Sequence, residues 1–547
     1  MLHLYKNPFI TVSPLLACAF FLFATPSLLG QSGGAIEQLW LNENYGPVTS
    51  AASLGDVNGD GIPDFATGSL SSTSNSGKLL VYSGSDYSMI WSVSLQAGAI
   101  CAISDLDSDG HSDLIVVNDH FFGGAKAYSG VNGNLLFELS TPPGYTRFRV
   151  QDLADVGDIN SDGISDIAAS SIDDSNGSVF LFSGTNGALI NRLDSPWLDA
   201  DFGYSIASLG DLDGDNFSEL LIGAPGSFST ASASRAVVIS LGTRSLLYHF
   251  SRPREWKFGQ SVAALEDADG DGITDFVIAA PMTNGSLGYS TGDIYIYSGS
   301  TGALLQQHQG QPSEKLGWDF VEDAGDIDRD GLSDVMVSKN HFRTSPAYIL
   351  PKVAFYSSVS SEILYEWKDH EMVYPDRQVF GAALGDINQD GLLEMLIGIS
   401  YGFAIWPINK LEIHSFTPGV FPTAAAFSAS AGATLDFEIN FPDAAAQENY
   451  RVLISASGIG STLFGVEIPL QSDSFVLDSF LGIYPFSTYS GLHGTLNNHG
   501  NAAASITVPA NAYLGLVGRT FHLAVVANPS GFLPNYTSIA VPVTIEP

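Results

Sequence analysis

The chain has 547 residues, 45% of them hydrophobic, and a formal net charge of −37. A chain of this length can form two or more domains, each with its own hydrophobic core. The charge argues against nucleic acid as a partner, because phosphate backbones are bound by clustered Lys and Arg, and here 58 acidic residues outnumber 21 basic ones.

The first 30 residues have the pattern of a secretory signal peptide. Lys6 is the one charged residue before Glu37, and the apolar core, residues 15–24, is too short to span a bilayer. The apolar run continues beyond Cys18, which argues against lipid anchoring at that cysteine. We therefore expect a secreted or cell-surface protein with a cleaved signal peptide, no transmembrane segment and a single remaining cysteine, Cys101.

A nine-residue acidic motif occurs seven times between residues 56 and 394. Its clearest copy, residues 267–275, has acids at positions one, three, five and nine and glycine at position six. Alternate side-chain oxygens and the backbone carbonyl of position seven match the ligands of Ca²⁺, and the glycine permits a sharp turn. The predicted metal ligands are Asp56, Asn58, Asp60, Ile62, Asp64, Asp105, Asp107, Asp109, His111, Asp113, Asp158, Asn160, Asp162, Ile164, Asp166, Asp211, Asp213, Asp215, Phe217, Glu219, Asp267, Asp269, Asp271, Ile273, Asp275, Asp326, Asp328, Asp330, Leu332, Asp334, Asp386, Asn388, Asp390, Leu392 and Glu394.

These loops are not EF-hands. An EF-hand needs a bidentate glutamate at position twelve and a helix on each side. Short apolar runs such as residues 276–280 follow the motif instead, and they predict buried strands. The sequence therefore predicts up to seven calcium loops inside β-hairpins. None of the residues at position twelve carries a carboxylate; they are Thr67, Val116, Ala169, Ile222, Ile278, Val337 and Ile397.

Each copy of the motif lies in a repeat of four predicted strands. In the fifth repeat these cover residues 261–265, 276–280, 293–297 and 302–306. Repeats at intervals of roughly 50 to 60 residues predict an all-β, seven-bladed β-propeller, whose closure protects its sheet edges. The last repeat has three predicted strands, at 380–384, 393–399 and 403–407, so we expect residues 36–42 to supply its outer strand and close the ring.

Two segments around the fourth and fifth loops identify the repeat type. Phe202-Gly203-Tyr204-Ser205 precedes Gly223-Ala224-Pro225, and Phe258-Gly259-Gln260-Ser261 precedes Ala279-Ala280-Pro281. The pattern resembles the FG-GAP repeat, the blade unit of the N-terminal propeller of integrin α subunits, and over residues 36–409 it is closest to the bacterial secreted type. The resemblance implies a calcium-binding propeller used in extracellular binding or cell adhesion, and it names no ligand.

The composition changes at about residue 411, where the acidic motif ends. Residues 411–547 contain several short β-prone runs separated by turn residues, which predict a β-sandwich domain of unknown function.

Aromatic and basic residues concentrate in the loops predicted to lie on the face opposite the calcium loops. Loops held by a rigid scaffold commonly carry binding residues, and these side chains suit an acidic glycan or a protein loop. The alternative is that they are solvated charges and aromatic rings packed between blades. The candidate ligand-binding residues are Trp197, Arg252, Arg254, Trp256, Trp318, His341, Arg343, Tyr374 and Arg377.

No catalytic residues are predicted. The sequence contains no G-x-S-x-G, H-E-x-x-H or P-loop motif. We therefore predict a non-catalytic, secreted calcium-binding protein that binds an extracellular glycan or protein. Two alternatives stay open: a propeller-based polysaccharide lyase or glycosidase, with an acid pair such as Asp173 and Asp174, and a structural component of an envelope or matrix.

Overall fold

The structure is a computed structural model of the chain. The predicted signal peptide, including Cys18, lies outside the residues that it describes. The described residues are 37–42, 48–70, 77–118, 124–145, 148–172, 176–198, 200–226, 233–253, 256–284, 290–328, 330–339, 352–359, 363–368, 377–389, 393–401, 410–416, 419–422, 426–441, 447–456, 470, 479, 488–498, 500–511, 514–528, 536–538 and 541–547.

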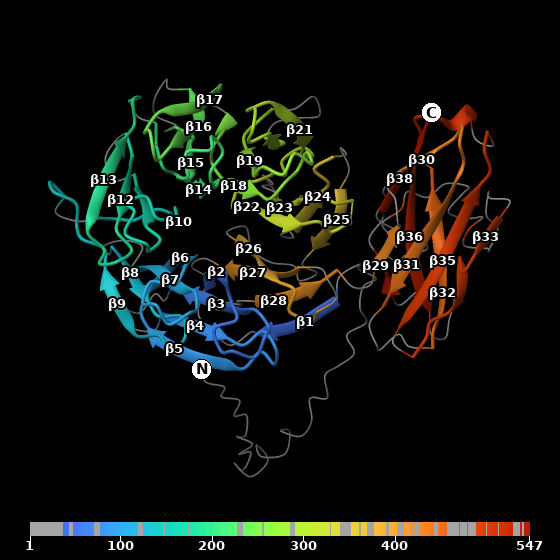
Figure 1. Cartoon of the computed structure of the whole chain (residues 1–547), viewed down its shortest axis with the longest axis horizontal. Helices are drawn as coiled ribbons and strands as arrows, with labels where there is room; N and C mark the ends of the chain where they lie inside the picture. The colour runs from blue at the N-terminus through green and yellow to red at the C-terminus, as the bar shows by residue number, and fades with distance from the viewer. Residues whose placement is uncertain are drawn as a thin grey trace, which may run out of the picture.

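Within these residues, the strands up to β28 form seven four-stranded antiparallel sheets arranged in a ring (Figure 1). The all-β propeller fold predicted from the sequence is confirmed. The strands, sheet by sheet, are β2 (Val48–Gly55), β3 (Asp64–Ser69), β4 (Lys78–Tyr82) and β5 (Met89–Ser94); β6 (Ala97–Ile103), β7 (Asp113–Asn118), β8 (Ala125–Tyr128) and β9 (Leu135–Glu138); β10 (Leu153–Asp155), β11 (Ile167–Ser171), β12 (Ser178–Phe182) and β13 (Leu189–Asp194); β14 (Ile206–Ser208), β15 (Glu219–Ala224), β16 (Ser234–Ser240) and β17 (Leu246–Arg252); β18 (Val262–Leu265), β19 (Asp275–Ala280), β20 (Asp293–Tyr297) and β21 (Leu304–Gln309); β22 (Val321–Gly325), β23 (Asp334–Lys339), β24 (Lys352–Tyr356) and β25 (Ile363–Lys368); β26 (Arg377–Gly385), β27 (Glu394–Tyr401), β28 (Lys410–Ser415) and β1 (Glu37–Asn42).

The seventh sheet contains both the first and the last strand of the ring. β1 pairs antiparallel with β28, from Glu37 opposite Ser415 to Asn42 opposite Leu411. The order β1-β28-β27-β26 puts β1 at the outer edge of this sheet. Backbone hydrogen bonds between β1 and β28 therefore close the ring.

The domain boundary predicted at residue 411 is wrong, because β28 belongs to the propeller. Leu411 and Ile413 are buried in a core that they share with Leu384 and Leu396. This strand was not predicted, because charged residues interrupt its apolar pattern. Buried Glu412 is compensated by an ion pair with Lys410 and by a hydrogen bond with His414 at 2.7 Å. The strand predicted at 403–407 falls outside the described residues.

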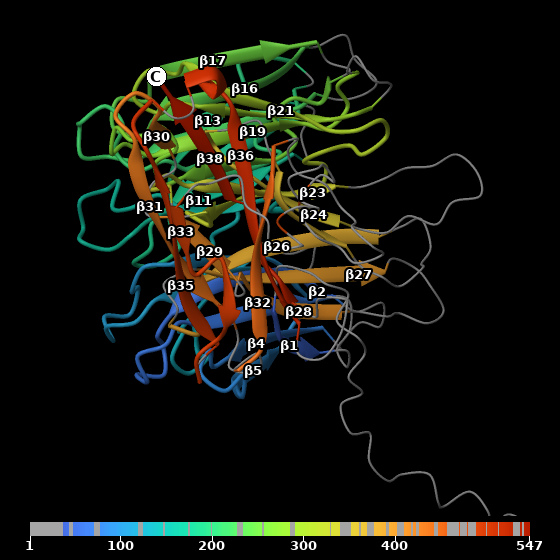
Figure 2. The same cartoon turned by 90° about the vertical axis from the view of Figure 1, so that its right-hand side faces the viewer.

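Two further sheets form the C-terminal β-sandwich, which lies beside the propeller in Figure 1 and in front of it in Figure 2. Leu435, Phe437 and Ile439 of β31 are buried while their neighbours are not, which is the alternation of a half-buried strand. These side chains pack in one core with Val452 and Val525 from the other sheet. The elements are β29 (Gly419–Pro422), β31 (Ala433–Asn440), β35 (Asn501–Val508) and β33 (Thr488–Ser490) in one sheet; β30 (Ala426–Ser428), β38 (Val541–Glu546), β36 (Thr520–Asn528), β32 (Asn449–Ser455), β34 (His493–Thr495) and β37 (Tyr536–Thr537) in the other; and the short 3₁₀ turn η3 (Leu514–Leu516).

The propeller sheets pack face to face. β15, β19 and β23, the second strands of their sheets, are buried along their whole length, whereas fourth strands such as β17 are half-buried. At the end of the ring, the buried ring of Phe416 packs edge-on against Phe355, with centroids 4.9 Å apart. Among the helices described, none combines the length and apolar character needed to cross a bilayer.

Candidate metal centres and ligand-binding face

Each acidic loop joins the first strand of a sheet to the second, so the loops lie on one face of the ring. The loop between β18 and β19 is representative. Both carboxylate oxygens of Asp267 accept backbone N–H groups, from Gly270 at 2.6 Å and Gly272 at 2.9 Å. Asp271 accepts the N–H of Ile273 at 2.8 Å. These bonds fold the loop around its own acids.

Position six needs a left-handed backbone. Gly272 has a φ of +79°, and it donates its N–H to the first acid of the loop. In the fourth loop this position is Asn216, with a φ of +70°, and it donates to Asp211 at 2.8 Å. Asparagine adopts this conformation more readily than most residues, so the fourth loop keeps the geometry of the others.

The acid at position nine has a structural role that the sequence analysis missed. Asp275 is completely buried, and it accepts the N–H groups of Ala268 at 2.7 Å and Gly299 at 2.8 Å. It therefore ties the loop to the end of the third strand, β20. A Cβ on Gly299 would lie 1.9 Å from the carbonyl oxygen of Thr274, so only glycine permits this approach. In the first three sheets, the acid at position nine likewise accepts the N–H of the corresponding glycine, which is Gly84, Gly130 or Gly184.

In four of the described loops, three acids each place an oxygen within 4.8 Å of the other two. This spacing suits one divalent cation with carboxylate ligands. The groups are Asp105, Asp107 and Asp113; Asp211, Asp213 and Glu219; Asp267, Asp269 and Asp271; and Asp326, Asp328 and Asp334.

Two buried acceptors in these groups support a cation site. The Oε1 atom of Glu219 and the Oδ2 atom of Asp328 are buried and have no hydrogen-bond donor among the residues that the structure describes. Burial, followed by the charges of Asp330 and Asp326, raises the pKa of Asp328 to about 7. Burial likewise raises the pKa of Asp113 to about 6. Burial penalises a carboxylate whose negative charge is not compensated. These loops therefore have both the oxygen ligands and the excess negative charge that suit a divalent cation.

The loops with asparagine at position three differ from these four. In the first loop, Nδ2 of Asn58 donates to Asp60 at 3.0 Å and to Asp64 at 3.3 Å. In the third, Nδ2 of Asn160 donates to Asp166 at 3.0 Å. In both loops the amide nitrogen faces the acids. The side chain would have to turn so that its oxygen faces them before either asparagine could bind a cation. In the seventh loop Asp390 and Leu392 lie outside the described residues.

His111, at position seven of the second loop, links two neighbouring loops. Its Nδ1 lies 2.8 Å from the carbonyl oxygen of Asp56 in the first loop. The sequence predicts only a backbone ligand here, because a contact between two loops cannot be inferred from a single repeat.

The motif before each first strand also carries a bond between sheets that the sequence analysis missed. The fourth residue of Phe258-Gly259-Gln260-Ser261 accepts the N–H of Val321 in the next sheet at 3.0 Å. Ser205 likewise accepts from Val262, and Asp319 from Val379. A recurring Ser or Asp at this position was the available signal.

The predicted ligand-binding residues share no single environment. The Arg252 guanidinium lies over the rings of Phe258 and Tyr295, 5.2 Å from each centroid, and donates to the hydroxyl of Tyr297 at 3.0 Å. Trp256 packs against the core between the fourth and fifth sheets. For these two residues, packing between blades is the better description.

Trp318 and Trp197 each lie beside a basic residue. The Lys315 ammonium lies 4.3 Å from the centroid of Trp318, and the Arg235 guanidinium lies 4.9 Å from that of Trp197. Trp197 also lines a cleft described below. Arg254, His341, Arg343 and Tyr374, with the acid pair Asp173 and Asp174, fall outside the described residues; the backbone of Arg377 lies in β26, and its side chain is not described.

Comparison with known proteins agrees with this geometry. The model of the FG-GAP repeat matches residues 48–82, 202–239 and 258–297. Integrin alpha-3 of Cricetulus griseus is 33% identical over 181 residues, which are 29% of this chain and 16% of the integrin. Integrin alpha-V of Gallus gallus is 29% identical over 217 residues, 35% of this chain and 20% of the integrin. The chain thus matches only a minor part of the length of these relatives.

Solved structures with similar folds have lower sequence identity. BBS1N, in a complex with ARL6DN soaked with lead, has a TM-score of 0.44 at 11% identity, over 70% of this chain and 98% of that chain. The Dos1 propeller has a TM-score of 0.40 at 14% identity, over 75% and 94%. These matches show that the chain contains FG-GAP repeats and that its β-propeller is similar to that of integrin alpha subunits.

Proposed function

We propose that this protein is a secreted, non-catalytic binding or adhesion protein whose propeller is rigidified by calcium. The observation that carries the proposal is the set of acidic loops, in which carboxylate oxygens converge and buried acceptors lack donors. In each loop, calcium would be held by the side-chain oxygens of positions one, three, five and nine and the carbonyl of position seven. Sites of this extracellular type bind with dissociation constants of about 10⁻⁴ to 10⁻³ M.

The location outside the cell is supported by the signal pattern of residues 1–30. The binding role is supported by the similarity to integrin alpha subunits. An extracellular glycan or protein is the partner that fits aromatic and basic side chains on the face opposite the calcium loops.

The test is a paired screen of the secreted full-length protein. The protein in millimolar calcium is applied to a glycan array and to immobilised matrix proteins, and in parallel to soluble polysaccharides whose reducing and unsaturated ends are measured. We expect binding in calcium that is lost in EDTA, without new chain ends. New ends would show a lyase or glycosidase instead, and the absence of binding on every surface would refute the binding function.

A further inference from the structure

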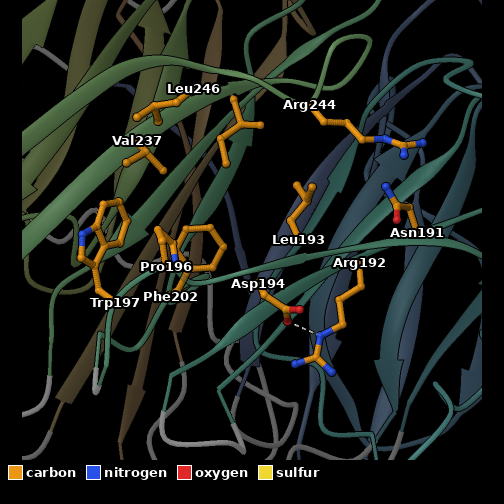
Figure 3. Close-up of a pocket in the computed structure, with 11 residues that line it drawn as sticks. Asn191, Arg192, Leu193, Asp194, Pro196, Trp197, Phe202, Val237, Arg244 and Leu246 are labelled. Carbon is orange, nitrogen blue, oxygen red and sulfur yellow. Dashed lines mark hydrogen bonds and ion pairs between the residues drawn. The ribbon is translucent and has the colours of Figure 1, made fainter.

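A cleft of 390 Å³ opens between the third and fourth sheets of the propeller. Its walls come from β13 on one side and from β16, β17 and their connecting turn on the other. In Figure 3, Trp197, Pro196 and Phe202 form one end, and Asn191 and Arg244 lie together at the other. The volume falls within the range of small-molecule sites, about 300–1,000 Å³.

At three other junctions between described sheets, the corresponding space is filled. There, an aromatic ring of the fourth strand packs on a glycine in the turn between strands three and four of the next sheet. A Cβ added to that glycine would lie 2.6 to 2.8 Å from the ring. The pairs are Trp91 with Gly133, Phe137 with Gly187, and Tyr248 with Gly302.

At the junction of the third and fourth sheets, both partners are replaced. The strand register identifies the equivalent positions. Trp91, Phe137 and Tyr248 each come directly after a bulge in the fourth strand of their sheet. In β13 the residue directly after the bulge is Asn191, which pairs with Leu181. The glycine position is occupied by Arg244, with a φ of +59°. The small amide leaves the aromatic site open, and the cleft is the space that results.

The turn between strands three and four requires a left-handed backbone at the position of Arg244. L-residues rarely adopt a positive φ, and glycine occupies this position in three sister turns. In the first sheet the same position is Tyr87, which packs against a hydrophobic core. The Arg244 guanidinium makes no hydrogen bond or ion pair with any residue that the structure describes. Strained residues held at an open site are candidates for function.

The cleft is cationic within a very acidic chain. Arg192 is neutralised by its ion pair with Asp194, and it also donates to Oγ of Ser178 at 2.9 Å. Arg244 has no such partner among the described residues, so one positive charge remains at the Asn191 end. A guanidinium with free N–H groups is suited to a carboxylate, which it binds with two parallel hydrogen bonds.

The opposite end of the cleft is a preorganised aromatic wall. The Trp197 ring stacks on His249, with centroids 5.1 Å apart and an interplanar angle of 18°. Arg235 lies 4.9 Å from the same indole, and Oγ of Ser195 bonds the N–H and the carbonyl of Trp197. Because neighbours already hold the indole, little side-chain entropy is lost when a ligand packs beside it.

We propose that this cleft binds a uronic acid residue of an acidic polysaccharide. The apolar face of the sugar packs in the apolar end, beside Trp197, and its carboxylate pairs with Arg244, while Asn191 bonds a hydroxyl. A peptide fits less well, because peptides are commonly bound by strand addition and the polar groups at this end of the cleft are side chains. The proposal deepens the proposed binding function, on which it rests, by naming one site and one ligand class.

Calorimetric titration of the full-length protein with trigalacturonic acid, in calcium buffer, tests the proposal. Arg244→Gly installs the glycine of the sister turns, and Asn191→Trp installs the aromatic ring. We expect each variant to fold and to lose about tenfold or more in affinity, because the charge-assisted bond or the space is removed. Arg519→Gly removes an exposed arginine from the sandwich and is the charge-matched control, expected to bind normally.

Two comparisons separate this proposal from the proposed function. The uncharged methyl ester of trigalacturonic acid is expected to bind weakly, and tetraglutamate to show no Arg244-dependent binding. Equal affinity of wild type and Arg244→Gly would overturn the cleft assignment while leaving the propeller as a binding protein, since the uronate would then be bound at another site. Tight binding of tetraglutamate would show general anion recognition and overturn the sugar assignment, and so would absence of trigalacturonate binding by the wild type.

Discussion

The propeller buries carboxylates, whereas the described core of the sandwich is apolar. In the propeller, buried acids such as Asp275 hold backbone N–H groups together and raise the local negative charge. In the described part of the sandwich, the core consists of alternating apolar side chains such as Leu435, Phe437 and Ile439. We therefore infer that propeller stability depends on charge compensation by cations, whereas sandwich stability depends mainly on apolar burial.

Removing calcium tests this difference most strongly. We predict that exhaustive dialysis against EDTA speeds amide hydrogen exchange throughout the propeller loops and lowers the melting temperature, because repulsion between the loop acids is no longer offset. Peptides from β31, β32 and β36 in the sandwich should keep their exchange rates. Equal protection of both domains before and after dialysis would show that the propeller does not depend on cations.

Substitutions within one loop separate its structural acid from an acid that serves only a cation. We predict that Asp275→Ala destabilises the protein by about 2–5 kcal/mol even in EDTA, because two buried N–H groups lose their acceptor. Asp269→Asn is the matched control: in EDTA it should change stability by about 0.5 kcal/mol or less, yet it should weaken calcium binding. Urea unfolding with and without calcium measures both effects, and similar losses for the two variants in EDTA would contradict the assigned roles.

The pH dependence of the metal-free protein should have the opposite sign from that of a protein stabilised by carboxylate ion pairs. Burial raises the pKa of Asp113, Asp166 and Asp275 to about 6 in the folded state, against about 3.9 when unfolded. Their contribution to stability is fully present below about pH 3.9 and is lost as pH rises through about 6.

In EDTA, we therefore predict that the melting temperature rises when the pH is lowered from 7.5 to 5. In saturating calcium this rise should vanish or reverse, because protons then compete with the cation. Thermal melts at matched ionic strength measure both curves. A melting temperature in EDTA that falls steadily over this pH range would show that these acids are not destabilised by burial.

The smallest predicted effect concerns one bond between neighbouring sheets. Ser261→Ala should destabilise the protein by about 1 kcal/mol, because Oγ accepts the buried N–H of Val321. Ser92→Ala, at an exposed position of β5, should be neutral. Denaturant melts in calcium measure the difference, and equal stability of the two variants would exclude this contribution.

The sequence predicted features that depend on local pattern. The loops and the strand at 36–42 could be placed because their residue types repeat at regular positions. β28 was missed because its buried Glu412 and His414 compensate one another, which a hydrophobicity pattern cannot show. The double role of Asp275 and the cleft at Asn191 were missed because both depend on contacts between strands far apart in sequence.

The calcium content of the purified protein tests the central claim most directly. After dialysis against millimolar calcium, elemental analysis with a matched buffer blank gives the number of ions per chain. We predict up to seven, with the loops containing Asp107, Asp213, Asp269 and Asp328 filled first, because their acids already converge. A calcium content equal to that of the blank would show that these loops are held by their own hydrogen bonds, and the account would be wrong.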